Sequence, residues 1–375
     1  MANTATAITT ATANATSTKR RKLADQTHHR CRNRPHLPPL LPGLPDHIAE
    51  LCLSLLPPSL LFSVCRSWRH LLSSPSFPPY LSLYLLSSSS SSSSLHFFSF
   101  DPIFSRWHRI PPPPLRPLLR HPSFLSRNFS VQSLAVSDNL LLLAATGPGF
   151  LPALHHPLVF RPNSQSWDFG PSLEAPRRWC VAGTAAGAVF AASGIGSHYT
   201  IDMARSVEKW EMKSEKEEWA KMRDHKDGSK FSREAIDAVG WRGKLCMVNE
   251  AKEGAVYNVE RDEWGDMPEG MVAGWRGPTA AMEEEVLYSV DEARGALMKY
   301  DPGRDGWEEV VRSERLRGAE QMAARGGRVC IVCSGGRMIV VVDVVETPAR
   351  MWVVDPPSGY EAVAVHVLPR MTTVQ

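Results

Sequence analysis

The chain has 375 residues and 43% hydrophobic residues, ordinary for a globular protein and long enough for roughly two or three domains. Its seven Cys are odd in number and sparse, which excludes a disulfide scaffold and predicts reduced thiols. No uninterrupted apolar run of about 18 residues occurs and no apolar segment follows a basic start, so we expect neither a membrane span nor a secretory signal.

Residues 1–41 are predicted to be a disordered basic tail. Residues 1–18 are mainly Ala, Thr and Asn and offer little apolar surface to bury. The tail contains seven Lys or Arg and one Asp, a charge of +6, which leaves −3 for the rest of the +3 chain. Nucleic acid is therefore not an expected partner. The cluster Lys19–Lys22 is either a nuclear import signal or a solvated basic arm, and we expect the protein in the nucleus, the cytoplasm or both.

A transit peptide is disfavoured because residues 1–18 lack Arg.

Residues 42–84 are predicted to be a small helical domain. Pro45-Asp46 marks a helix start at which Asp46 caps free N–H groups, and Pro57-Pro58 ends that helix. Four apolar residues follow at helical spacing on one face: Ile48, Leu51, Cys52 and Leu55. A second helix is expected from Ser59 to Leu72. Two short helices bury too little surface alone, so their apolar faces require a partner.

This block resembles an F-box, the motif that binds the adaptor subunit of cullin–RING ubiquitin ligases. The resemblance rests on the run LPGLPDHIAELCLSLLP and on VCRSWRHLLSSPSF after it. It implies adaptor contacts from ten residues: Leu44, Pro45, Ile48, Leu51, Leu53, Leu56, Pro57, Val64, Trp68 and Leu71. Between Pro57 and Val64 the chain is shorter than the family pattern by about three residues, close to one helical turn. The alternative is an ordinary helical hairpin docked on the rest of the chain.

Residues 85–375 form the remaining predicted domain. It includes the polyserine run Ser87–Ser94, which is expected to be a flexible loop. Pro111–Pro114 is expected to be stiff and extended, because the proline rings fix four successive φ angles.

Tryptophan recurs through this domain at a nearly constant interval. Six of them are spaced by 60, 52, 45, 43 and 45 residues: Trp107, Trp167, Trp219, Trp264, Trp307 and Trp352. Each follows an apolar strand and a polar turn, as in LMKYDPGRDGW. A second hairpin, with small residues in its first strand, lies between successive Trp, as in QMAARGGRVCIVCS. Each period therefore holds about four strands, which is one propeller blade.

The repeats resemble degenerate kelch repeats, with Gly335-Gly336 as the kelch-like double glycine. The six Trp units predict about six blades, with five or seven left open, and in this interpretation the Trp side chains are mainly hydrophobic contacts between sheets. The expected fold is mainly β, a kelch-like propeller preceded by a small α-helical F-box. The combination resembles the F-box/kelch-repeat proteins abundant in plants.

No catalytic constellation is evident, and we expect neither a metal nor a cofactor. Cys330 and Cys333 form a C-x-x-C pair, but they lie on a predicted strand, where positions three apart point to opposite faces. The charge run Glu208–Lys230 is either a solvated outer hairpin with Trp219 packed inward or a target-contacting insertion.

Four arginines fall 10 to 14 residues after a repeated Trp, each just before a small-residue strand: Arg178, Arg233, Arg276 and Arg317. If the strand starts share one face, these guanidinium groups surround one mouth. With Trp179 they would suit an acidic or phosphorylated target peptide. Alternatively, each Arg braces its own blade by bonding loop carbonyls or a neighbouring acid.

The resemblance implies a non-catalytic substrate-recognition subunit of an SCF-type E3 ubiquitin ligase, in which the F-box binds the adaptor and the propeller binds a target protein. Two alternatives stay open. One is a propeller enzyme with a helical cap, which predicts a deep pocket lined by polar groups or a metal. The other is a scaffold whose shortened F-box no longer recruits a ligase.

Overall fold

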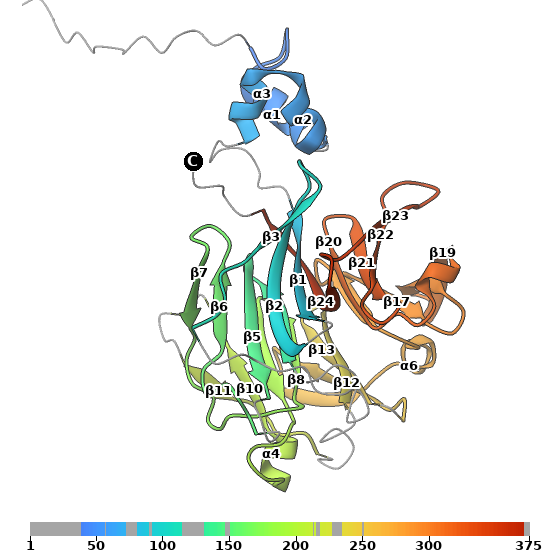
Figure 1. The fold of residues 1–375 in the computed structure, drawn as a ribbon. Helices are drawn as coiled ribbons and strands as arrows, with labels where there is room; N and C mark the ends of the chain where they lie inside the picture. Colours follow the sequence, from blue (N-terminus) through green and yellow to red (C-terminus); the bar gives the residue numbers. More distant parts are fainter. Residues whose placement is uncertain are drawn as a thin grey trace, which may run out of the picture.

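The computed structural model describes residues 39–56, 58–72, 81–89, 92–114, 131–146, 151–212, 214, 218–226, 235–249 and 251–370. Within these residues, three short helices precede six four-stranded antiparallel sheets arranged as the blades of a propeller (Figure 1). The six-blade prediction is confirmed. The tail up to residue 38, including Lys19–Lys22, lies outside the described residues, as do Pro57 and Arg233.

The N-terminal helices are α1 (Asp46–Ser54), α2 (Pro58–Val64) and α3 (Arg66–Leu72). The predicted single helix from Ser59 to Leu72 is wrong, because it is broken at Cys65. At the break, Arg69 Nε donates to the Phe62 carbonyl at 2.6 Å, and this bond satisfies an acceptor at the end of α2. Asp46 is also not the cap that we predicted. Pro45 holds that position, and the Asp46 carboxylate accepts from Leu40 N at 3.2 Å.

Each blade has an inner strand at the propeller axis and an outer strand at the rim. From the axis outward, blade 1 comprises β24 (Tyr360–Pro369), β1 (Leu81–Ser89), β2 (Ser92–Asp101) and β3 (Arg106–Arg109). In the same order, blade 2 comprises β4 (Val131–Val136), β5 (Asn139–Ala145), β6 (Leu158–Arg161) and β7 (Ser166–Phe169). Blade 3 comprises β8 (Val181–Ala185), β9 (Ala188–Ala192), β10 (Val207–Trp210) and β11 (Trp219–Lys221).

Blade 4 comprises β12 (Ala235–Trp241), β13 (Lys244–Asn249), β14 (Gly254–Asn258) and β15 (Glu263–Asp266). Blade 5 comprises β16 (Thr279–Met282), β17 (Val286–Asp291), β18 (Ala296–Asp301) and β19 (Gly306–Arg312). Blade 6 comprises β20 (Gln321–Arg325), β21 (Arg328–Cys333), β22 (Met338–Asp343) and β23 (Arg350–Val354). Connections carry α4 (Ile201–Arg205), α6 (Glu269–Gly274) and the 3-10 helix η3 (Glu314–Leu316).

The polyserine run Ser87–Ser94 is not the flexible loop that we predicted, because its two ends belong to β1 and β2. Ser88 pairs with Leu95 and Ser89 pairs with Ser92, while Ser87 and Ser88 are buried. The apolar residues on either side of the run set the register and carry the serines into the sheet. The helical part ends at Leu72 and β1 begins at Leu81, so the last residues of the predicted 42–84 domain belong to blade 1.

Small residues in the inner strands allow the blades to meet closely around the axis. A Cβ added to Gly240 of β12 would lie 1.6 Å from the Thr184 carbonyl oxygen of β8. Only glycine permits this approach of two backbones. The small-residue strands therefore lie at the middle of the propeller.

Each repeated Trp lies in the outer strand of its blade. Five of the indoles donate to a carbonyl just past the outer strand of the preceding blade, at 2.7 to 3.1 Å: Trp107 to Asp355, Trp167 to Pro111, Trp219 to Pro171, Trp264 to Arg223 and Trp307 to Gly270. The Trp residues are therefore hydrogen-bond links between blades as well as the hydrophobic contacts that we predicted.

In blades 4 and 5 an aspartate two residues before the Trp completes this link. Asp262 accepts from Arg223 N at 2.9 Å, and Asp305 accepts from Gly270 N at 2.9 Å. Both aspartates have a positive φ, 52° and 46°. We call each Asp and Trp pair a blade clamp, because it binds both the N–H and the C=O groups of the preceding connection.

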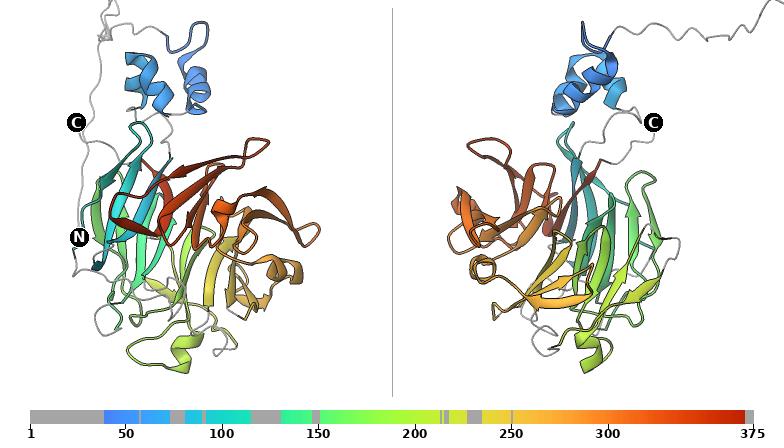
Figure 2. Two further views of the ribbon diagram at one scale, coloured as in Figure 1. Left: turned by 45° about the vertical axis from the view of Figure 1, so that its right-hand side comes forward. Right: turned by 180° about the vertical axis from the view of Figure 1, so that it is seen from behind.

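The propeller has two distinct ends. Because every blade has four antiparallel strands, all inner strands begin at the same end. Helices α1–α3 lie beyond the end where β1 begins and β24 finishes, whereas α4 lies at the opposite end (Figures 1 and 2). We call these the near face and the far face. The far face carries the connections that lead into the inner strands.

Candidate functional site

The three N-terminal helices have a very small core. Leu53, Leu61 and Leu71 are buried together, and the Trp68 indole donates to the Leu40 carbonyl at 2.9 Å beside them. Three of the predicted adaptor-binding residues, Leu53, Trp68 and Leu71, therefore hold the helices together. Three buried leucines are a small core, so a binding partner would add much to the stability of this unit.

The same helices expose a much larger apolar set, which we call the apolar surface: Leu44, Ile48, Leu51, Leu55, Leu56, Leu60 and Val64. Leu51 is 60% exposed and Leu55 is 85% exposed. Five of the seven are predicted adaptor-binding residues, and the predicted Pro45 is exposed beside them. Leu55 and Leu60 were missing from that prediction. Their helical spacing from Leu51 and Val64 was the signal that could have identified them.

None of the described residues covers the apolar surface, although α2 touches the propeller. The Phe62 ring lies edge-on to the ring of Phe104 in the turn between β2 and β3, with the ring centroids 5.2 Å apart. Arg69 lies over the Phe62 ring and Arg106 lies over the Phe104 ring, each at 5.1 Å. The helices thus stand at the near face of blade 1 with their apolar surface exposed to solvent.

The described members of the predicted arginine ring are in three different environments. Arg178 lies 4.4 Å over the Trp179 ring, Arg317 pairs with Glu314 at 3.0 Å, and Arg276 is exposed. All three precede inner strands and hence belong to the far face. The ion pair of Arg317 agrees with the alternative prediction, in which each arginine braces its own blade by bonding to a neighbouring acid.

The neighbouring Arg177 has a structural role that the sequence did not indicate. It is 1% exposed, pairs with Glu208 at 3.2 Å and donates to the Ser193 carbonyl at 3.1 Å. Burial raises the pKa of Glu208, and the Arg177 guanidinium opposes that shift. Glu208 begins the predicted charge run, so this part of the run is buried rather than solvated, and Trp219 is half-buried in β11.

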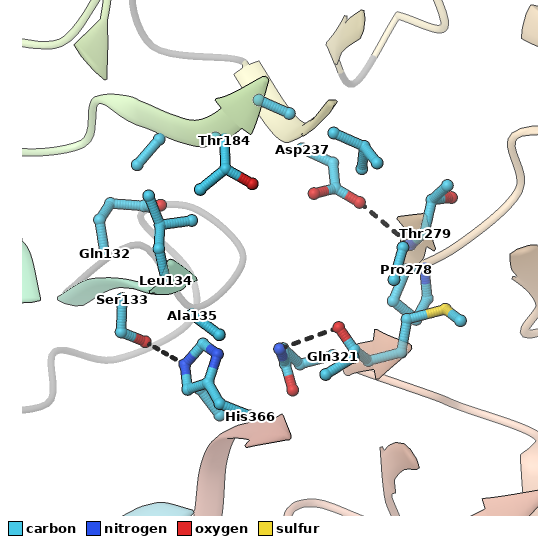
Figure 3. Close-up of a pocket in the computed structure, with 18 of the residues that line it drawn as sticks. Gln132, Ser133, Leu134, Ala135, Thr184, Asp237, Pro278, Thr279, Gln321 and His366 are labelled. Carbon is cyan, nitrogen blue, oxygen red and sulfur yellow. Dashed lines mark hydrogen bonds between the residues drawn. The ribbon is translucent and has the colours of Figure 1, made fainter. Parts of the chain in front are cut away.

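A cavity of about 250 Å³ lies on the propeller axis between the inner strands. Several of its polar side chains bond to adjacent inner strands (Figure 3). His366 lies 2.8 Å from the Ser133 hydroxyl, and Asp237 accepts from Thr279 N at 3.1 Å. Gln321 accepts from Val365 N at 2.8 Å. These side chains therefore hold neighbouring blades together around the cavity.

Neither cysteine of the C-x-x-C pair is accessible. Cys330 and Cys333 are buried in separate clusters on opposite faces of β21, as predicted, and burial raises the pKa of each thiol to about 12. The described residues contain no group of three or more His, Cys, Asp or Glu that could hold a metal ion. Within the same residues, no helix has the length and apolar character needed to cross a bilayer.

Comparison with known proteins gives two relatives of the same kind. No protein-family model matches the chain. The chain is 49% identical over 358 residues to the Arabidopsis thaliana "F-box/kelch-repeat protein SKIP25", an alignment that covers 89% of this chain and 90% of the relative. It is also 25% identical over 323 residues to the Arabidopsis thaliana "F-box protein AFR", covering 79% and 82% of the two chains.

Proposed function

The chain belongs to the F-box/kelch-repeat proteins, and we propose that it is the substrate-recognition subunit of an SCF-type E3 ubiquitin ligase. The F-box helices bind the adaptor subunit of the ligase and the propeller binds a target protein. The chain itself is non-catalytic, since its contribution is to raise the effective concentration of the target lysine near the ubiquitin-charged enzyme. It acts in the nucleus, the cytoplasm or both.

The observation that carries this proposal is the apolar surface on α1 and α2. Fully burying one Leu, Ile or Val side chain stabilises a complex by about 1.5–3 kcal/mol, and seven such side chains are exposed between Leu44 and Val64. An apolar patch of this kind on a soluble protein marks an interaction site. Its position, with the small core on the other side of the same helices, suits docking without unfolding.

The experiment is capture of a recombinant adaptor subunit by the full-length chain carrying Leu51→Asp and Leu55→Asp. We expect at least about a hundredfold weaker binding, because two charged groups would be buried in place of two leucines. Both residues are exposed in the free chain, so the melting temperature should stay unchanged. Leu151→Asp is the matched control, because Leu151 is 52% exposed on blade 2 and far from the helices, and it should leave adaptor capture intact.

Unchanged capture by the double variant would refute the assigned surface. If the unaltered chain fails to bind any adaptor, the scaffold alternative replaces the ligase role. The control separates both outcomes from a general loss of folding or solubility.

A further inference from the structure

Trp179 on the far face has a backbone conformation that is unusual for so bulky a residue. Its φ is 51°, in the left-handed region that favours glycine. The other non-glycine residues with positive φ in the described parts of the chain lie in turns and loops within single blades. Trp179 instead lies in the connection from β7 to β8, between two blades. Such strain concentrates at binding sites, where the surrounding structure enforces it.

Arg178, directly before it, lacks the partner that its charge calls for. Its guanidinium stacks 4.4 Å over the Trp179 ring, and its Nε is buried without a hydrogen-bond acceptor. No carboxylate of the described residues lies within ion-pairing distance of Arg178, whereas Arg177 pairs with Glu208 and Arg317 with Glu314. The terminal N–H groups of the same guanidinium are not buried and bond to no acceptor of the described residues, so an incoming oxyanion would meet the charge there.

Exposed apolar side chains lie on the segment whose backbone pairs with Arg178. The backbone of Arg178 exchanges two hydrogen bonds of 2.9 Å with Ile195, which brings the connection beside the segment between β9 and β10. That segment carries α4, and its Tyr199 and Ile201 are 41% and 51% exposed. Thr200, between them in the sequence, caps α4 by accepting a hydrogen bond from Met203 N at 3.3 Å.

We propose that Arg178, Trp179, Tyr199 and Ile201, the blade 3 anchor, bind a target segment in which an Asp or Glu adjoins an apolar side chain. This rests on the proposed function and narrows the predicted ring of four arginines to one. A carboxylate fits better than a phosphate, because the anchor has one uncompensated positive charge. A phosphate dianion would retain net negative charge there, since the adjacent Arg177 is already neutralised. The stacked guanidinium presents its edge to a carboxylate while the indole offers apolar contact.

The experiment selects peptides from a random dodecapeptide phage library on the immobilised full-length chain. The affinities of the enriched peptides for three forms of the protein are then measured by fluorescence polarisation. The forms are the unaltered chain, Arg178→Gln and the control Arg276→Gln, which alters an exposed arginine of the far face that, unlike Arg178, stacks on no ring of the described residues. We expect enriched peptides with Asp or Glu beside an apolar residue, binding that falls about tenfold or more in Arg178→Gln, and little change in Arg276→Gln. Arg178→Lys should give an intermediate loss, because lysine keeps the charge and loses the planar stack.

The proposal is overturned if no peptide is enriched, if the enriched peptides lack acidic residues, or if both glutamine variants lose affinity equally. Tighter binding of a phosphoserine version of the same peptide would favour phosphate over carboxylate. The composition of the selected peptides is read on the unaltered chain, so the test survives misfolding of a variant. Adaptor capture by the same preparations is scored separately. Acidic peptides without capture would refute the ligase role alone, and capture without such peptides would refute the anchor alone.

Discussion

His366 is a buried titratable side chain that joins two blades. It is 5% exposed in β24 of blade 1, and its Nε2 lies 2.8 Å from the Ser133 hydroxyl in β4 of blade 2. Burial lowers the pKa of His366 to about 4, from an ordinary value near 6.5. The folded chain therefore holds this imidazole neutral over a pH range in which the unfolded chain protonates it.

This difference predicts that acid weakens the propeller above the range in which carboxylates titrate. Below about pH 6.5 the unfolded chain binds a proton at His366 that the folded chain does not bind. The contribution of the neutral His366 to stability is therefore present above pH 6.5 and is lost as the pH drops toward 4. We expect a loss of about 2 kcal/mol between pH 7.5 and pH 5, measured by urea denaturation at the two pH values. The His366→Gln variant keeps a hydrogen-bonding side chain that does not titrate in this range. Between the two pH values, its free energy of unfolding should therefore fall by about 2 kcal/mol less than that of the unaltered chain. Parallel pH profiles for the two proteins would contradict the prediction.

At the scale of single elements, the blade clamps show what the recurring Trp contributes. The Trp264 indole donates to the Arg223 carbonyl at 2.9 Å, across the junction of blades 3 and 4. The Trp210 indole lies in β10 of blade 3, and its buried N–H has no hydrogen-bond partner among the described residues. The two residues allow the hydrogen bond to be separated from the packing of the ring.

We expect Trp264→Phe to lower the free energy of unfolding by about 1 kcal/mol, because it deletes the hydrogen bond between blades and keeps an aromatic ring. Trp210→Phe is the control, at a ring that is 4% exposed and so more deeply buried than that of Trp264. It loses no hydrogen bond and removes an unsatisfied buried donor, and this gain offsets the loss of packing. The measurement is urea denaturation followed by far-UV circular dichroism. A larger cost for Trp210→Phe than for Trp264→Phe would show that packing, not the hydrogen bond, dominates at these positions.

The spacing of residues in the sequence predicted the strands and blades well. It predicted less well which side of a helix or which charge would meet a partner in the folded chain. The interval between Trp residues gave the blades, because each blade repeats the same turn, strand and contact. In α1, however, the predicted apolar face of Ile48, Leu51 and Leu55 is the exposed one, while Ala49 and Leu53 face the small core. A helix with apolar residues on two sides does not reveal from spacing alone which side is internal. The sequence also could not predict that Arg178 lacks an acidic partner among the described residues, because ion pairing depends on where the Asp and Glu side chains lie in the folded chain.

For the whole molecule, the decisive feature is that the two ends of the propeller chain meet in one sheet. The inner strand of blade 1 is β24, at the end of the described chain, and it pairs with β1 from Leu81↔Pro369 to Ser89↔Tyr360. The Tyr84 hydroxyl donates to the Pro369 carbonyl at 2.7 Å, and Arg370 pairs with the buried Asp101 at 2.7 Å. The Trp repeat did not predict this closure, because β24 contains no Trp. Its alternating Ala and Val do match the small-residue pattern of the other inner strands.

Truncation tests whether this closure holds the propeller together. A chain ending at Gly359 lacks β24, so the edge of β1 and the apolar residues facing Val363 and Val365 become exposed. We expect such a chain to lose cooperative thermal unfolding and to aggregate, because each blade depends on the contacts of its neighbours. A chain ending at Arg370 keeps β24 and the Arg370–Asp101 pair and should melt like the full chain. Cooperative melting of the Gly359 chain within a few degrees of the control, by calorimetry, would mean that blades 2 to 6 are stable without ring closure. The structure of the blade 3 anchor would then depend only on blade 3 and the blades next to it.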